Sequence, residues 1–261
     1  MRARAFHLFG IRFRDATKRD LVAAVAQAVT DRRRCVIADY NLHFLYLCCH
    51  LPEMREFNSS ADCTHIDGLS LVLLGRLFGL PLRSDHRTTW LDLLPLLAEE
   101  ATRRQWRIFY LGSRPGVAEK GARALRARYP GLLISARDGY FDTNRFSKDN
   151  QGVLAEIRRY APDILLVGMG MPRQETWILQ NREEIAAHAI FTSGALMDYV
   201  AGEVPAPPRW LGPLGLEWLY RLLSEPARLW RRYLVEPWLI FIYMASRYLR
   251  KGHPSTKSPH D

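Results

Sequence analysis

Short apolar segments alternate with stretches of helical periodicity along the first four-fifths of this chain. Apolar runs suited to buried strands cover 35–38, 107–111, 132–136, 164–167 and 189–192. Between them, apolar residues recur at helical spacing over 20–31, 41–50, 90–104, 117–129, 151–160 and 174–188. Strands that alternate with helices are typical of a mostly parallel sheet covered on both faces. We therefore predict an α/β domain over residues 1–204.

Three of these strands run into loops of small residues. Gly112 and Ser113 follow one strand, Gly168 and Gly170 follow a second, and Gly194 follows a third. The carboxyl ends of parallel strands form the ligand-binding edge of such a sheet, and loops of this kind let backbone amides approach a phosphate. A purely structural turn is an equally good interpretation of each loop alone. The loops at 112–116 and 168–173 lack the Rossmann and Walker glycine patterns, which disfavours NAD and ATP.

The composition changes after residue 204. Three prolines in 205–208 indicate a linker, because proline disrupts a helix interior, and between Arg221 and Lys251 there are seven basic and two acidic residues among aromatic and aliphatic ones. This mixture is typical of interfacial helices. We predict that 205–251 is a helical, membrane-docking appendage broken at Pro226 and Pro237, and that 252–261 is a disordered tail. The alternative is a helical hairpin packed on the core, with its arginines simply solvated.

The charge balance points to a polyanionic partner. The 261 residues include 37 Lys and Arg against 27 Asp and Glu, a net charge of +10. Because the basic residues of the C-terminal segment lie beside bulky aliphatic ones, we expect an anionic membrane surface as a partner and no nucleic acid.

Two further features bear on location. The opening residues lack the apolar core of a signal peptide, and the apolar run 238–245 is far shorter than the ~20 residues of a spanning helix. The four cysteines show no disulfide or zinc spacing. We expect a cytoplasmic protein, peripheral on the inner face of the cell membrane.

Asp67 is the leading candidate for acid–base chemistry. It precedes Gly68 and an apolar helical stretch, so it could simply cap that helix. Alternatively, it could deprotonate an attacking hydroxyl, as transfer of a sugar to an alcohol requires. A nucleoside diphosphate leaving group then needs cations or oriented dipoles. The α/β part has no Asp-x-Asp motif for a metal, whereas arginines pair well with phosphate.

A series of motifs in this sequence resembles the WecG/TagA/CpsF glycosyltransferase family. They stand in order along the chain over about residues 35–240: Asp39-Tyr40-Asn41, His65-Ile66-Asp67-Gly68, 110–116, 168–175, Gly194-Ala195, 208–210, 217–221 and Glu225-Pro226. The combination is far more specific than any single loop.

This resemblance implies a Rossmann-like domain with a C-terminal appendage that aids membrane docking and completes the active site. It further implies an inverting, metal-independent transfer to an undecaprenyl-diphosphate-linked acceptor. By position, Asp67 matches the family's proposed base, Asn41 an Asn of its Thr-x-Asn motif, and Gln174 a Gln of the donor pocket. The appendage arginines that match diphosphate ligands are Arg221, Arg228 and Arg231.

The chain departs from the family pattern at three positions. Asp39 stands where Thr is usual, Trp90 where a Gly is usual, and Ser70 where a second Gly would follow Asp67. These departures put the usual ManNAc donor in doubt and suit a branch resembling the xanthan-type glucosyltransferase GumM. Asp39 is either a second acid near the acceptor or a strand-end carboxylate that caps the helix after it.

Together these observations predict a hexosyltransferase of cell-surface polysaccharide biosynthesis, such as exopolysaccharide synthesis. It would move a hexose or N-acetylhexosamine from a UDP-sugar donor of the ManNAc or glucose type to a polyprenyl-diphosphate-linked glycan acceptor. We expect no cofactor and no metal. The competing hypothesis is a non-catalytic scaffold, peripherally bound in an exopolysaccharide assembly complex.

Overall fold

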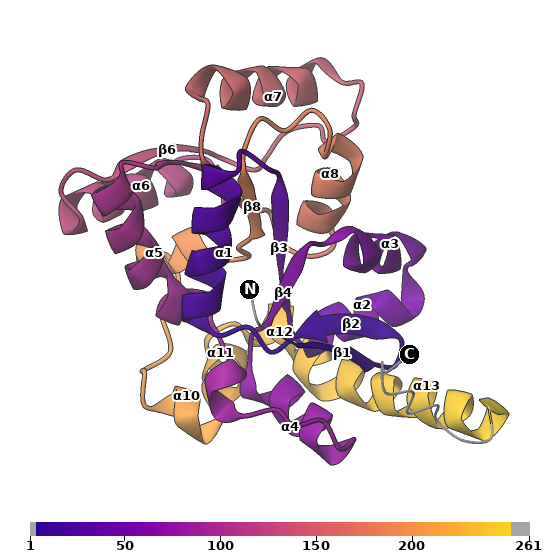
Figure 1. Ribbon diagram of the computed structural model, residues 1–261. Coiled ribbons are helices and arrows are strands. Elements are labelled where there is room, and N and C mark those ends of the chain that lie inside the picture. Colours follow the sequence, from indigo (N-terminus) through magenta and orange to yellow (C-terminus); the bar gives the residue numbers. More distant parts are fainter. Residues whose placement is uncertain (1–3, 252–261) are drawn as a thin grey trace.

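The computed structural model describes residues 4–251 and consists of an α/β domain followed by C-terminal helices (Figure 1). The predicted tail at 252–261 lies outside the described residues. Six parallel strands form the central sheet in the order β4-β3-β8-β7-β5-β6. Their bounds are β3 Cys35–Tyr40, β4 Cys63–Ile66, β5 Arg107–Gly112, β6 Leu133–Arg137, β7 Ile164–Gly168 and β8 Ala189–Thr192. The prediction of a parallel α/β sheet is confirmed.

Helices cover both faces of this sheet, as predicted. Successive strand residues point to opposite faces, so Ile108 and Tyr110 join one hydrophobic cluster while Phe109 and Leu111 join the other. One face is covered by α2 Leu42–His50, α3 Pro52–Ser60, α4 Leu69–Leu77, α7 Lys148–Tyr160 and α8 Arg173–Asn181. The other is covered by α1 Lys18–Thr30, α5 Trp90–Arg104, α6 Val117–Arg128 and α9 Leu196–Val200.

Several short elements had no clear signal in the sequence. A hairpin of β1 Ala5–Leu8 and β2 Ile11–Arg14 flanks β4, and α3 follows α2 directly. Four-residue strands are too short for an alternating pattern to stand out. In β4 the pattern is further masked because Thr64 and His65 are fully buried yet polar: Thr64 accepts from the Arg14 N–H, and His65 Nδ1 lies 3.1 Å from the Thr88 carbonyl.

Helix α8 is shorter than predicted. It ends at Asn181 rather than near residue 188, because Asn181 is buried and its amide contacts the side chain of Asn150 and the Trp177 carbonyl. The chain then turns to enter β8, which pairs with β3 and β7.

The C-terminal helices are α10 Leu211–Leu214, α11 Glu217–Ser224, α12 Pro226–Trp230, a π-helical turn η2 Arg231–Val235 and α13 Glu236–Lys251. The predicted break at Pro226 is confirmed, since α11 ends just before it and α12 begins with it. The predicted break at Pro237 is wrong. Pro237 lies in the first turn of α13, where the missing N–H is tolerated, and η2 joins α12 to α13 without interruption.

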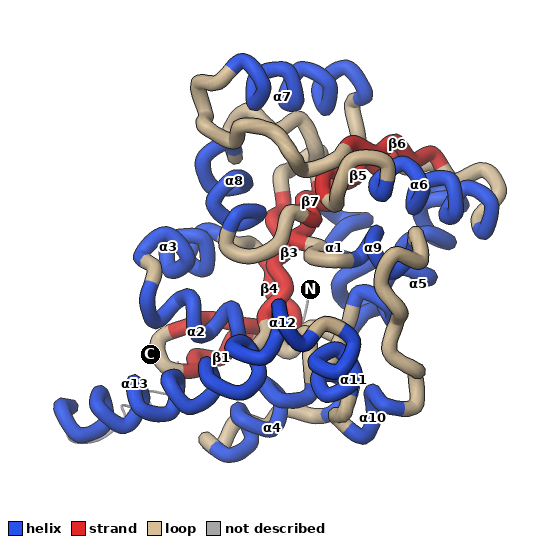
Figure 2. The backbone as a smooth tube through the Cα atoms, turned by 180° about the vertical axis from the view of Figure 1, so that it is seen from behind, coloured by secondary structure: helices blue, strands red, loops and turns tan. Residues whose placement is uncertain are grey.

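The C-terminal helices lie along one edge of the α/β domain, with α12 near the end of β4 (Figure 2). Helix α13 packs on α2 through buried Ile240 and a hydrogen bond of 2.6 Å between His43 Nδ1 and the Glu236 carboxyl. An ion pair of 2.6 Å joins Arg87 to Glu217 of α11. No helix among residues 4–251 is long and apolar enough to span a membrane.

Candidate functional site

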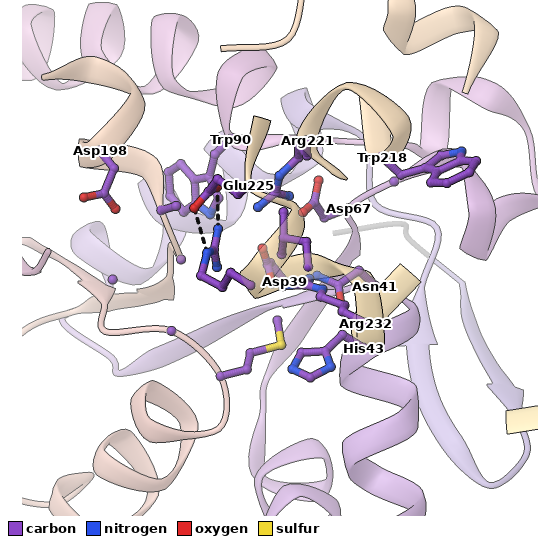
Figure 3. Close-up of a pocket in the computed structure, with 18 of the residues that line it drawn as sticks. Asp39, Asn41, His43, Asp67, Trp90, Asp198, Trp218, Arg221, Glu225 and Arg232 are labelled. Carbon is purple, nitrogen blue, oxygen red and sulfur yellow. Dashed lines mark hydrogen bonds and ion pairs between the residues drawn. The ribbon is translucent and has the colours of Figure 1, made fainter. Parts of the chain in front are cut away.

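A cleft of about 1250 Å³ opens beyond the carboxyl ends of the central strands, and the C-terminal helices close one side of it (Figure 3). Its walls include the loops after β3, β4, β5, β7 and β8 together with residues of α11, α12 and η2. This is the sheet edge at which α/β proteins bind ligands. All eleven site residues predicted from the sequence line this cleft except Gly112, which lies directly beneath it.

Asp67 lies at the end of β4, partly buried, and points toward the C-terminal helices. Its backbone N–H donates to the Tyr40 carbonyl at 2.7 Å, which joins the ends of β4 and β3. The N-cap of α4 is Gly68, whose φ of 104° suits only glycine, and no side chain caps that helix. The capping interpretation of Asp67 is therefore wrong, and its carboxyl is available to the cleft.

The surroundings of Asp67 combine burial with nearby arginines. Burial raises the pKa of the Asp67 carboxyl, Arg221 and Arg232 act in the opposite direction, and Glu217 adds to the increase. The outcome is a raised pKa. A carboxylate with a raised pKa is a stronger base. The same arginines limit this increase and so favour the ionised form that can accept a proton.

Asp39 lies at the end of β3, beside the strand that carries Asp67, and only 5% of it is exposed. Its N–H donates to Thr192 Oγ1 at 2.8 Å, whereas its Oδ1 atom has no hydrogen-bond partner among the described residues. The cap of α2 is Asn41, which accepts from the Phe44 N–H at 3.1 Å. The capping interpretation of Asp39 is therefore wrong. Burial raises the pKa of Asp39 well above its usual range, and the carboxylates of Asp67 and Glu175 add to this.

The glycines after β5 and β7 are needed for close packing as well as for the cleft. Gly112 and Gly168 are paired across the two strands, and a Cβ on Gly112 would overlap the Gly168 backbone. Ser113 donates its N–H to the Gly168 carbonyl at 3.1 Å and lies 2.8 Å from the Tyr110 hydroxyl. Gly170 has a φ of 80° and open space at its Cβ position, as a loop that admits a ligand requires.

Gln174 lies in the first turn of α8 and is fully buried. Its amide nitrogen donates to Glu175 at 2.7 Å, and its carbonyl oxygen accepts from the Gly194 N–H at 3.2 Å. The Gln174 amide is thereby fixed between α8 and the loop after β8, with one N–H left for a ligand. Glu175 is fully buried too, and burial raises its pKa to about 7.

Four arginines of the C-terminal helices line the cleft. Arg221 is partly buried, stacks over Tyr199 at 5.9 Å and faces Asp67. Arg228 pairs with Glu225 at 2.6 Å, and Arg231 is exposed at the rim. Arg232 is partly buried and acts on the carboxyls of Asp39, Asp67 and Glu175. The alternative in which the arginines are simply solvated is wrong for Arg221 and Arg232.

Two lining residues, Asp198 and Arg232, were not singled out from the sequence, and Trp90 was noted there only as a departure from the family pattern. Arg232 stands next to Arg231, and only the π-helical turn decides which of the two points inward; such turns often occur at functional sites. Asp198 of α9 lies at the far side of the cleft, where burial raises its pKa. Trp90 donates its indole N–H to the Thr192 carbonyl at 2.9 Å, which anchors α5 beneath the cleft. An ion pair between Asp92 and Arg209 joins α5 to the segment that precedes α10.

Within residues 4–251 no group of three or more His, Cys, Asp or Glu side chains is arranged to hold a metal ion. The positive charges that face the candidate base are instead guanidinium groups. Guanidinium groups bind phosphate with paired hydrogen bonds.

Comparison with known proteins agrees with this geometry. The profile of the Glycosyl transferase WecG/TagA/CpsF family matches residues 6–254. A curated relative from Bacillus spizizenii is 33% identical over 186 residues, which cover 71% of this chain and 69% of the relative. It is an N-acetylglucosaminyldiphosphoundecaprenol N-acetyl-beta-D-mannosaminyltransferase. From the cleft, its acids and arginines and these matches, we conclude that the chain belongs to the WecG/TagA/CpsF family of glycosyltransferases.

Proposed function

We propose that this protein transfers a hexose or N-acetylhexosamine from a UDP-sugar to an undecaprenyl-diphosphate-linked acceptor at a membrane surface. The transfer inverts the anomeric carbon and needs no metal ion. The relative from Bacillus spizizenii supports the acceptor class, since its name specifies a diphosphoundecaprenol-linked N-acetylglucosamine. The departures at Asp39, Ser70 and Trp90 leave glucose and ManNAc both open as the transferred sugar.

The observation that carries this proposal is the position of Asp67. Its partly buried carboxyl lies in the cleft and faces Arg221 and Arg232 of the C-terminal helices. A base must approach the attacking hydroxyl, while cations approach the departing diphosphate. Asp67 would take the proton of the acceptor hydroxyl as that oxygen attacks the anomeric carbon. UDP would leave with the bonding electron pair.

The departing diphosphate requires positive charge on the opposite side of the sugar. Arg221, Arg228 and Arg231 line the cleft together with the loops that contain Ser113 and Gly170. We assign these three arginines to the diphosphate and the loop amides to its oxygens. Asn41 also lines the cleft, and we assign its side-chain NH2 group to orient the acceptor.

The proposal of membrane docking rests on the surface of the C-terminal helices. Ile240 faces α2, whereas several large apolar side chains of these helices are exposed: Trp218, Leu219, Leu223, Trp230, Leu234, Trp238, Leu239, Phe241 and Ile242. Amphipathic helices with aromatic and basic residues insert into the headgroup region. Docking by this surface would bring the lipid-linked acceptor to the open side of the cleft.

A donor screen tests the proposed function. Purified protein, anionic vesicles and undecaprenyl-diphosphate-linked acceptors are incubated with UDP-glucose, UDP-GlcNAc or UDP-ManNAc, and the lipid products are separated. We expect transfer from at least one donor, which persists in a metal chelator. Isothermal titration of UDP is measured beside it. UDP binding without any transfer would contradict the acceptor class, and absence of both would favour the non-catalytic scaffold.

A further inference from the structure

The order of the strands places Asp39 between the two halves of the proposed site. The candidate base Asp67 ends β4, and the loops assigned to the donor follow β5 and β7. Strand β3, which ends near Asp39, lies between β4 and β8 in the same sheet, with β7 and β5 beyond. In any such transfer the sugar lies between the attacking hydroxyl and the departing diphosphate. A sugar held in that way would lie above Asp39.

No hydrogen bond among the described residues gives the buried Oδ1 atom of Asp39 a role in the fold. Its backbone N–H contacts Thr192, and its Oδ1 atom is buried with no hydrogen-bond partner among the described residues. The helix cap that could have used this carboxyl is supplied by Asn41. A buried polar atom without a partner is costly, so its retention indicates that a ligand provides the missing hydrogen bond.

The charges around Asp39 favour its neutral form. Burial is the strongest influence, the carboxyls of Asp67 and Glu175 reinforce it, and the guanidinium groups of Arg232 and Arg221 oppose it. The net effect is a raised pKa, which favours the protonated carboxyl. A carboxylic acid offers one donor and one acceptor. A sugar hydroxyl offers the same pair in return, whereas an acetamido N–H can only donate.

We propose that Asp39 is a sugar-binding residue of this enzyme, whose buried carboxyl exchanges hydrogen bonds with one free hydroxyl of the transferred sugar. This inference rests on the proposed function and deepens it, because it assigns a determinant of donor specificity. It makes Asp39 distinct from the base Asp67: one carboxyl binds the sugar, and the other accepts a proton.

The test pairs enzyme variants with sugar analogues. The donor that is turned over fastest among UDP-glucose, UDP-GlcNAc and UDP-ManNAc is compared with its singly deoxygenated analogues, in the wild type, Asp39→Ala and Asp39→Asn. We expect one deoxy analogue to lower the wild-type kcat/KM by roughly 10²-fold, since the hydrogen bonds between its missing hydroxyl and Asp39 are lost. Asp39→Ala should lose a similar factor with the parent donor and nothing further with that analogue.

The variant Asp39→Asn tests whether the Asp39 carboxyl acts in its neutral or its ionised form. An amide also donates and accepts, so this variant should stay within about tenfold of the wild type. UDP affinity serves as the control for folding and should be unchanged in both variants. The assignment would be overturned if Asp39→Ala were as sensitive as the wild type to every deoxy analogue. It would also be overturned if Asp39→Asn were as inactive as Asp39→Ala, or if both variants lost UDP binding.

These outcomes remain distinct from a failure of the proposed function. Wild-type protein that neither binds UDP nor transfers a sugar would contradict the function itself, and the assignment of Asp39 with it. Wild-type turnover with an unaffected Asp39→Ala would contradict only Asp39.

Discussion

The carboxyl groups and the guanidinium groups of this cleft come from two regions of the molecule that are built differently. Asp39 and Asp67 lie at the ends of neighbouring strands of a buried sheet, and Glu175 lies in the first turn of a helix on its face. The arginines come from C-terminal helices whose outward side chains are largely exposed. The acids are thus fixed in position and desolvated, while the cations depend on how those helices dock. The core therefore fixes the position of the Asp67 carboxyl, whereas the C-terminal helices supply the arginines that lower its pKa.

The largest effect is expected when the candidate base Asp67, which the core holds in place, is replaced. We expect Asp67→Asn to lower turnover roughly 10²–10⁴-fold, the usual contribution of a positioned base, with UDP affinity within about twofold of the wild type. Transfer rates and calorimetric titration of UDP measure the two effects. Glu99→Gln, which changes an exposed carboxylate of α5, is the matched control. Near-normal turnover of Asp67→Asn would show that another group is the base.

The second test concerns the desolvation of the core acids. Burial raises the pKa of Glu175 from the ordinary 4.5 to about 7. The folded protein therefore holds this proton over a pH range in which the unfolded chain has released it, so the free energy of unfolding falls as pH rises from about 4.5 to about 7. The fall due to Glu175 should reach up to about 3 kcal/mol.

Urea unfolding at several pH values measures this effect. Glu175→Gln, which can still accept from Gln174, should lose that part of the pH dependence, so its stability relative to the wild type should increase with pH. Glu99→Gln should parallel the wild type. Parallel curves for Glu175→Gln and the wild type would show that Glu175 is ionised in the folded protein.

The third test removes a cation of the appendage that faces the base. Arg221 lowers the pKa of Asp67, so Arg221→Gln should raise it and move the acid limb of the kcat/KM profile to higher pH, by about one unit. The pH–rate profile measures this shift. Arg123→Gln on α6 alters an exposed arginine of the core and should leave the limb in place. A shift to lower pH would contradict the proposed proximity of Arg221 and Asp67.

The smallest expected effect concerns the outer surface of the appendage. Trp238 is 70% exposed on α13, and Trp238→Ser should weaken binding to phosphatidylglycerol vesicles several-fold while the free energy of unfolding changes by less than about 0.5 kcal/mol. Vesicle co-sedimentation measures the binding. Phe146→Ser changes an aromatic residue that is 87% exposed near α7, at the far end of the α/β domain, and should have no effect. Equal losses in both variants would indicate nonspecific adhesion.

The sequence motifs identified much of the candidate site, but they could not decide whether Asp67 and Asp39 cap the helices that follow them. In the sequence, Asp67 and Asp39 both precede helical stretches and could each have been an N-cap. The caps are instead Gly68 and Asn41, one residue and two residues farther along. Helix boundaries shift by one or two residues under tertiary packing, and here that shift decides whether a carboxyl is occupied or available.

The sequence alone determined the alternation of strands and helices, the small-residue loops and the basic character of the C-terminal segment. These features are local in composition or periodicity. The role of Arg221 as a candidate was instead implied by motifs that resemble those of the family. Tertiary structure decided that Arg232 rather than Arg231 is the more buried of the two arginines, that Glu175 fixes Gln174, and that Asp39 has a carboxyl oxygen without a partner. Each of these depends on how burial and distant charges combine around one side chain, and residues far apart in the chain set both.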